Sequence, residues 1–293
     1  MSGPSEWLKT TGEEWRRAAG EAAERLLISY REKFGDAIPV DLHLLAKTLD
    51  STVVRVRNMR DDAKLLPVRG GFQILVRDDL RTARGRTAIA HELCHTLFYA
   101  REEPVPKRLN GLDAKAAGRE EAFCFDAGRR VLAPDWAIKQ LGLATADADV
   151  ILTTLTRCLN LSRDIAARAM LEDHALVEGV AHKWVLRNGE WKIESGHSFV
   201  SNSLKARTKE IKLLHQVSLG CLMKGVYPRS ECSVVAFKEP SGDAAFVIVQ
   251  VFSLENLASR LTRLLATIDP QSMFPMHMSP RRAAVVRNAS ALH

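Results

Sequence analysis

The chain is poor in cysteine and in long apolar runs, and both features exclude classes of protein. Its five cysteines are scattered, odd in number and without a CxxC pair, which argues against a disulfide framework and favours reduced thiols. The longest apolar stretch of note, 244–252, is interrupted by Gln250 and is far shorter than the roughly 20 residues that cross a bilayer. Residues 1–17 are polar and charged, unlike a signal peptide. We therefore expect a cytoplasmic protein with no membrane partner.

The remaining composition is that of a globular protein with a basic C-terminal part. Apolar residues make up 46% and charged residues 26% of the 293 positions, a length that suits two domains or one domain with an appendage. Of the net charge of +7, residues 176–293 supply +6, from 15 Lys and Arg against 9 Asp and Glu. A solvated basic surface explains this excess, and contact with an anion or a nucleic acid is the alternative. Because no run of basic residues is present, the sequence favours the first explanation.

Hydrophobic periodicity predicts helices and strands alternating in the first part of the chain. Asp41 stands where a side chain can cap a helix, and Gly70-Gly71 precedes a run with strand alternation. A polar loop is expected over 58–64. The predicted helices are 13–34, 42–49, 87–99 and 117–132, and the predicted strands are 52–56 and 72–77.

The rest of the chain changes character twice. Residues 135–172 are expected to be all helical, and 155–170, with a turn at 160–162, resemble a helix-turn-helix. Asn188-Gly189 predicts a hairpin, 234–237 and 245–252 predict a second one, and 205–222 and 254–267 have helical periodicity. The prediction is an α+β fold in three parts: 1–134, 135–175 and 176–293.

The residues His91-Glu92-Leu93-Cys94-His95 form an HExxH motif on the helix predicted over 87–99. Positions i and i+4 lie one above the other on a helix, so both imidazoles can face one metal ion. Neutral imidazole is a good zinc ligand, and zinc lowers the pKa of a bound water to about 7. Glu92 lies next to the first ligand, where it can act as the general base that takes the proton of that water. The motif predicts a zinc-dependent peptidase.

A catalytic zinc needs a third protein ligand, and Glu120 and Glu121 are the candidates downstream. At about 100° per residue, Glu121 falls in the middle of an apolar stripe, whereas Glu120 falls toward its edge. The stripe consists of Cys124, Phe125, Gly128, Val131 and Leu132. A buried carboxylate needs compensation, which a metal ion would supply and which a buried Arg or His could supply instead. The prediction is Glu121 as ligand.

Three other side chains near the motif have two interpretations each. Cys94 and Cys124 are close enough in sequence to approach the metal, but a small buried thiol is the more common case. Tyr99, one turn beyond His95, is a candidate for stabilising an oxyanion, and packing on the core is the alternative.

The stretch from about residue 38 to 134 resembles the ImmA/IrrE family of metallopeptidases. The resemblance rests on Pro39-Val40-Asp41, Gly71-Phe72-Gln73-Ile74, the segment from Thr87 to His95, and the spacing from Glu121 to Val131-Leu132-Ala133-Pro134. It implies a zincin-like domain with His91, His95 and Glu121 as metal ligands and Glu92 as general base. Cys94 and Phe125 depart from the family, which often has Gly and Asn or Asp at these two positions.

In plan, the chain is similar to the IrrE type, in which a peptidase precedes helix-turn-helix-like helices and an α+β sensor-like domain of GAF type. Such proteins typically cleave a helix-turn-helix transcriptional repressor and so switch on a stress, DNA-damage or mobile-element programme. The resemblance implies Zn²⁺ as cofactor, for which Mn²⁺ could substitute in vitro. The competing hypothesis is a regulator that binds DNA or a partner through 150–293, with a structural or vestigial metal site.

Two further expectations concern how a substrate is handled. The strand predicted over 72–77 is expected to hold an extended segment of the target by backbone hydrogen bonds. Residues 176–293 are expected to regulate the peptidase without supplying a ligand, and Trp184 and Trp191 could line a pocket there or pack in the core.

Overall fold

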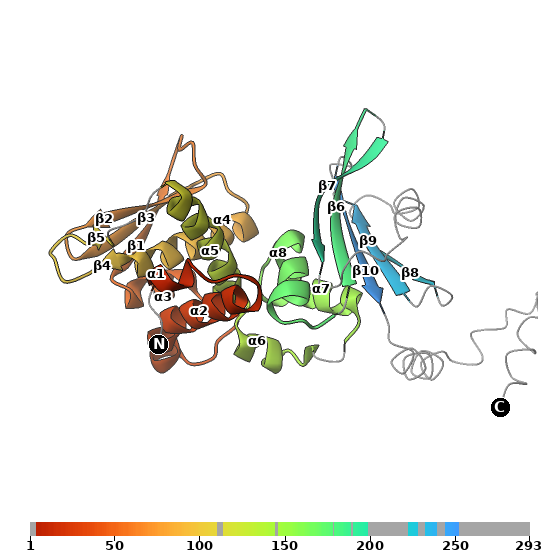
Figure 1. The fold of residues 1–293 in the computed structure, drawn as a ribbon, viewed down its shortest axis with the longest axis horizontal. Helices are drawn as coiled ribbons and strands as arrows, with labels where there is room; N and C mark the ends of the chain where they lie inside the picture. The colour runs from red at the N-terminus through yellow and green to blue at the C-terminus, as the bar shows by residue number, and fades with distance from the viewer. Residues whose placement is uncertain are drawn as a thin grey trace, which may run out of the picture.

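The computed structural model describes residues 4–109, 114–143, 146–177, 179–188, 190–198, 222–227, 232–238 and 244–251. A helix-rich part with a small mixed sheet comes first, short helices follow, and a five-stranded sheet comes last (Figure 1). The predicted α+β class is confirmed. None of the described helices is both long and apolar enough to cross a membrane.

In the first part, helix α4 packs against a three-stranded sheet, and α5 packs against α4 and the helix α2. Asp41 caps α3 as expected, because its carboxylate accepts hydrogen bonds from the His43 and Leu44 backbone N–H groups. The helices are α1 (Pro4–Trp7), α2 (Gly12–Phe34), α3 (Leu42–Thr48), α4 (Thr82–His95) and α5 (Ala114–Leu132), and a 3₁₀ turn (Thr96–Phe98) follows α4. The strands are β1 (Ser51–Val56), β2 (Ala63–Val68), β3 (Gly71–Arg77), β4 (Tyr99–Ala100) and β5 (Lys107–Arg108).

The order of the first sheet corrects the expectation for 72–77. The order is β1-β3-β2, so β3 is the central strand, parallel to β1 and antiparallel to β2. With both edges paired, β3 cannot offer its backbone to a substrate. Strand β2 was not predicted from the sequence, which placed residues 63–64 in a polar loop; it pairs only with β3 within the described residues and contains Pro67. Proline in a strand is typical of an edge, because it removes one ladder donor.

Two short helices with a turn between them follow, as predicted. Helix α7 (Ala148–Cys158) ends before Asn160, whose φ is +54°, and α8 (Arg163–Arg168) is capped by the Ser162 hydroxyl, which accepts from the Ile165 N–H. Helix α6 (Asp135–Gln140) precedes the pair, and a π-helical turn (Ala169–Asp173) ends it.

A buried ionic cluster fastens this helical segment to α5. Arg129 on α5 is 4% exposed and donates to both carboxylate oxygens of Asp173, at 3.0 Å each. It also donates to Asp126 at 2.6 Å and to Glu172 at 3.4 Å. Trp15 on α2 donates its indole N–H to Asp126 as well. The cluster therefore ties α2, α5 and the π-helical turn together.

The last part contains a five-stranded antiparallel sheet of order β7-β6-β10-β9-β8. Its strands are β6 (Gly179–Arg187), β7 (Glu190–Ser198), β8 (Leu222–Tyr227), β9 (Cys232–Lys238) and β10 (Ala244–Val251). Both predicted hairpins are confirmed: Arg187 pairs with Glu190 across Asn188, whose φ is +54°, and Ala245 pairs with Lys238. The helices expected at 205–222 and 254–267 lie outside the described residues, except for Leu222, which begins β8. The side chains of Trp184 and Trp191 also lie outside the described part of the structure.

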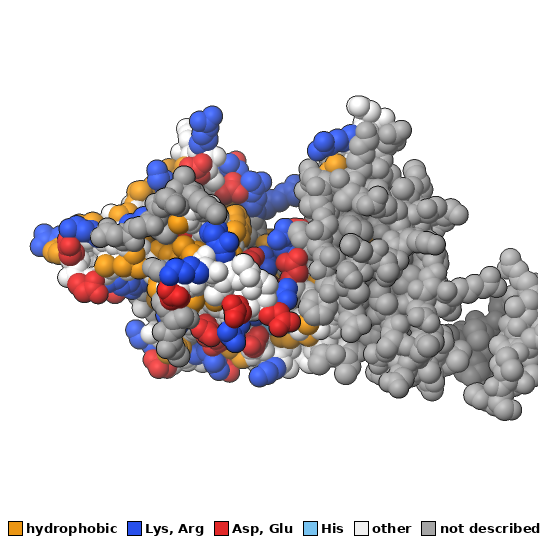
Figure 2. Space-filling model, viewed as in Figure 1, with side chains coloured by type: hydrophobic (Ala, Val, Ile, Leu, Met, Phe, Trp, Pro, Cys, Tyr) orange, Lys and Arg blue, Asp and Glu red, His pale blue; other side chains and the backbone are white. Residues whose placement is uncertain are grey.

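The hydrophobic core is continuous from the first part to the second sheet. One cluster of buried side chains extends from Trp7 through Leu93, Phe123 and Ile151 to Ile248. Helix α8 and the π-helical turn contact β6 in the second sheet, so the short helices lie between the two larger parts (Figure 1). On the face shown in Figure 2, basic and acidic side chains of the first part are interspersed with one another.

Candidate metal centre

Helices α4 and α5 approach each other closely at Gly128. A Cβ atom at this position would lie 3.2 Å from the His91 backbone nitrogen and 3.3 Å from the Ala90 carbonyl carbon. These separations are tight for a methyl group, and the neighbouring atoms belong to the backbone of α4. Glycine therefore permits the contact that places Glu120 and Glu121 of α5 beside the HExxH histidines of α4.

His91, His95 and Glu121 converge on one point. The His91 Nε2 atom lies 3.1 Å from a Glu121 carboxylate oxygen and 3.1 Å from the His95 Nε2 atom. The other Glu121 oxygen lies 3.4 Å from His95 Nε2. Donors about 2.0–2.1 Å from a tetrahedral zinc ion are about 3.4 Å from each other, so the spacing fits such an ion. Among the described residues this is the group of His, Cys, Asp and Glu that could hold a metal ion.

The burial of the two glutamates is the reverse of the helical-wheel expectation. The Glu121 side chain is 57% exposed, whereas Glu120 is fully buried. Phe125, counted in the apolar stripe, is 51% exposed. Glu121 thus approaches the histidines from the solvent side. It belongs to the donor group as predicted, but its expected place in the middle of a buried apolar stripe was wrong.

Glu120 contacts His95 at Nδ1, the ring nitrogen opposite the one that faces the donor group. One Glu120 oxygen lies 2.7 Å from His95 Nδ1 and 2.8 Å from the Arg108 guanidinium. With its proton on Nδ1, the imidazole donates to Glu120 and turns the lone pair of Nε2 toward Glu121 and His91. A histidine that binds a metal usually has such a partner, which fixes its tautomer and its ring orientation. From the sequence, Glu120 was expected only as a possible ligand, and this positioning contact was not predicted.

The two histidines differ strongly in proton affinity. Burial and the neighbouring His95 lower the pKa of His91 to about 4. Burial also acts to lower the pKa of His95, but its hydrogen bonds with Glu120 and Glu121 prevail and raise that pKa to about 9. The hydrogen bond from His95 lowers the pKa of Glu121 to about 2. At neutral pH His91 is therefore neutral, His95 is protonated and Glu121 is ionised. A divalent cation that binds here would displace the extra proton of His95.

Glu92 lies next to this group without belonging to it. Burial raises the pKa of its carboxyl, although His95 and a hydrogen bond from the Leu65 backbone in β2 act in the opposite direction. The side chain lines a cleft of about 840 Å³. His91, Glu92 and Glu121 line one part of this cleft, and Ile165 and Arg168 of α8 line another. A titratable carboxylate beside a donor group in an open cleft is the arrangement that proton transfer requires.

The other predicted candidates lie outside the donor group. Cys94 and Cys124 are buried, and burial raises the pKa of both thiols. Tyr99 packs edge-on against Phe72, with ring centroids 5.2 Å apart, and is not among the residues that line the cleft. Its proposed role toward an oxyanion stays a prediction.

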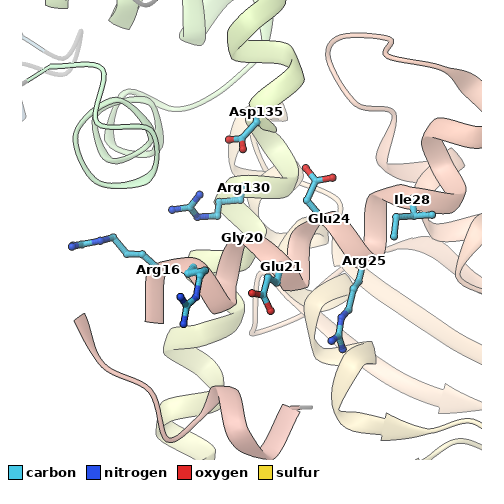
Figure 3. A pocket seen from close by; sticks show the side chains of 9 residues that line it. Arg16, Gly20, Glu21, Glu24, Arg25, Ile28, Arg130 and Asp135 are labelled. Atoms are coloured by element: carbon cyan, nitrogen blue, oxygen red, sulfur yellow. The ribbon is translucent and has the colours of Figure 1, made fainter. Parts of the chain in front are cut away.

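A second hollow, of about 390 Å³, lies along α2 (Figure 3). Arg16, Arg25 and Arg130 share it with Glu21 and Glu24, so its charges are mixed. It contains no histidine or cysteine. We therefore assign the metal centre to the cleft between α4 and α5.

Fold and donor group together define an α+β protein with a candidate site for a divalent metal ion. The chain matches no protein-family model and no curated protein. Among solved structures, it is similar to a Mycobacterium tuberculosis transcriptional regulator, with a TM-score of 0.51 and 15% sequence identity. The match covers 87% of this chain and 82% of the other. At this identity the similarity concerns the fold alone.

Proposed function

We propose that this chain is a site-specific zinc endopeptidase with a zincin-like first domain of the ImmA/IrrE type. One observation carries the proposal: the Nε2 atoms of His91 and His95 and the Glu121 carboxylate converge, with Glu92 beside them in an open cleft. Three protein donors leave a fourth position for a reactant, whereas structural zinc sites usually have four protein ligands. The competing idea of a structural metal site is thus less well supported by the donor count.

Each residue has a distinct role in this proposal. His91, His95 and Glu121 would hold the ion, and Glu120 orients His95. A zinc ion there would supply Lewis-acid chemistry, which makes a water molecule acidic at neutral pH and polarises a carbonyl group. Glu92 accepts a proton on its carboxylate and returns it to the leaving amine. Its raised pKa suits both steps, because a carboxyl group with a pKa nearer to neutral pH is a stronger base than an ordinary glutamate and can still give its proton back.

The edge strand β2 takes the role that was expected of β3. It is hydrogen bonded to Glu92 through the Leu65 backbone, and Asp62 and Ala63, at its start, line the cleft. An extended peptide can add to such an edge by backbone hydrogen bonds, while alternate side chains enter pockets. An unrestricted protease would be harmful inside a cell, so we expect the pockets to select the target and the enzyme to have little activity on casein.

The substrate class follows from the resemblance and from the layout of the chain. We propose a helix-turn-helix transcriptional repressor as target and a stress, DNA-damage or mobile-element response as outcome. The mycobacterial protein of similar fold is named a transcriptional regulator, which is consistent with a role in transcription. The five-stranded antiparallel sheet fits a sensor-like module of GAF type, and we propose that residues 176–293 regulate the peptidase.

A second candidate function is a regulator that binds DNA or a partner directly. It is favoured by the α7–α8 pair, which has the shape of a helix-turn-helix, and by the name of the similar structure. Residues that line the cleft occur on α8, however, which favours a role in the peptidase.

The test compares full-length wild type with Glu92→Gln, each co-expressed with candidate repressors encoded near its gene. The wild type should produce two repressor fragments, and Glu92→Gln should produce none while retaining one zinc ion per chain. Glu103→Gln, on the surface and paired with Lys107, is the matched control and should cleave normally. Cleavage by Glu92→Gln at the wild-type rate would refute the role of Glu92. If no repressor fragments form with wild type, and Glu92→Gln and Glu103→Gln both keep wild-type repression or DNA binding, the result would favour the direct regulator.

A further inference from the structure

The cleft extends from the donor group to an exposed aromatic ring on α5. Phe125 is 51% exposed, and its ring centroid lies 4.1 Å from that of His91. The ring therefore borders the donor group directly. Large apolar side chains left half-exposed beside a cleft often mark a binding surface, because covering them with an apolar ligand is favourable.

Other apolar side chains line the same cleft, and they come from several segments of the chain. Ile165 on α8 lines the same cleft, together with the small side chains of Ala63, Ala88 and Ala122. Helices α5 and α8 thus both contribute residues to the lining of one cleft.

The charged side chains around this apolar patch already have partners. Arg84 donates to the Asp62 carboxylate, and Arg129 donates to Asp126 at 2.6 Å. Arg168 lies 3.7 Å from Asp164 on the same helix. Since each of these cations has a carboxylate beside it, the rim does not call for a charged ligand. The chemistry of the hollow favours an uncharged, apolar group.

We propose that Phe125 and Ile165 form an apolar subsite that takes an aliphatic or aromatic side chain of a peptide next to the bond to be cleaved. The inference rests on the proposed peptidase function and names a residue preference for it. It assigns α8, the second helix of the helix-turn-helix-like pair, to substrate selection. Phe125 and Ile165 are specificity-determining residues in this scheme, not catalytic ones.

The experiment uses zinc-loaded, full-length protein and short peptide hydroxamates, which bind through the metal and need no turnover. Two series carry one varied side chain, Gly, Leu, Phe or Asp, on either side of the hydroxamate. In one series Leu and Phe should bind about tenfold more tightly than Gly, as burial of one apolar side chain predicts, and Asp should not. Phe125→Ala and Ile165→Ala should remove most of this gain and leave the Gly compound unchanged, whereas Phe125→Leu should retain it.

Val150→Ala is the matched control, since Val150 lies on α7, is 50% exposed and does not line the cleft. An apolar gain that is absent in wild type, or that persists in both alanine variants, would overturn the subsite. If the gain behaves as expected but no repressor or peptide is ever cleaved, the peptidase proposal fails, and only an apolar binding site for a peptide side chain beside the metal stands. If cleavage occurs without any side-chain preference, the peptidase stands and the subsite fails. A chain that binds no zinc would overturn both.

Discussion

Glu120 is the residue whose replacement tests the organisation of the metal centre most directly. Its carboxylate is fully buried and accepts hydrogen bonds from His95 Nδ1 and from Arg108. Glu120→Gln keeps the shape, and its amide oxygen can still accept a hydrogen bond from His95 Nδ1–H, but it removes the charge that raises the basicity of the imidazole. Glu120→Ala removes the contact altogether and leaves His95 free to rotate.

The expected magnitude follows from the place of Glu120 behind a donor rather than among the donors. Losing an outer partner of a metal-binding histidine lowers metal affinity by 10- to 100-fold, or about 1.4–2.7 kcal/mol. We expect about tenfold for Glu120→Gln and about 100-fold for Glu120→Ala. Arg108 adds little to the loss, since its side chain is 47% exposed and water can replace the carboxylate.

Affinity is measured by competition with a chromophoric zinc chelator, and circular dichroism checks that each variant is folded. Glu121→Ala, which removes a donor, should lose more affinity than either Glu120 variant. Glu103→Gln should bind as wild type does. Unchanged affinity in Glu120→Gln and Glu120→Ala would refute the positioning role. Loss of all zinc in Glu120→Ala, with full occupancy in Glu121→Ala, would mean that the ligand and its supporting residue have been interchanged.

Three further predictions concern pH, the ionic cluster and the helix contact. Because the pKa of His95 is about 9, zinc affinity should rise about tenfold per pH unit from 7 to 9, with about one proton released per ion, measurable by calorimetry in buffers of different ionisation enthalpy. The stability of the metal-free protein in chelator should instead fall as the pH rises. The raised pKa of His95 stabilises the fold fully below the unfolded value of about 6.5, and this contribution is lost as the pH rises through about 9. Asp173→Ala should lower the free energy of unfolding in urea by about 3 kcal/mol, because Arg129 stays buried with weaker compensation; a change below about 1 kcal/mol would contradict this. Gly128→Ala should lower zinc affinity while stability falls by about 1 kcal/mol, since crowding against the backbone of His91 exceeds the gain in helix propensity; unchanged affinity would mean that α4 and α5 separate without disturbing the donors.

Local signals in the sequence predicted much of the fold. The cap at Asp41, the turn before Ser162 and the hairpin at Asn188 all lie where they were expected. Each depends on residues close together in the chain. Strand β2 was missed because 63–68 contains Pro67 and no clear alternation, and its place at the sheet edge depends on pairing with β3. The edge position of β2 and the central position of β3 follow from topology, which local patterns do not contain.

The three residues of the donor group were predicted from the sequence, but Glu121 was chosen for the wrong reason. The helical wheel of α5 treated Phe125 as a core residue, and this centred the predicted apolar stripe on Glu121. In the structure the buried stripe of α5 is shifted by about one residue, and Glu121 lies at its exposed margin. The fully buried members of this stripe include Glu120, Phe123, Cys124, Ala127, Val131 and Leu132. A half-exposed phenylalanine beside a cleft looks like a core residue in the sequence, and only its tertiary surroundings distinguish the two.

The close contact at Gly128 fixes the number of residues that helix α5 can have between this contact and the metal centre. Glu121 and Gly128 are seven residues apart, or about two turns, so they face the same side of the helix. One meets the imidazoles of α4, and the other meets its backbone near Ala90. Inserting or deleting a single residue between them would rotate one relative to the other by about 100°. Homologues with the same metal centre should therefore vary in the identity of residues 122–127 but preserve their number.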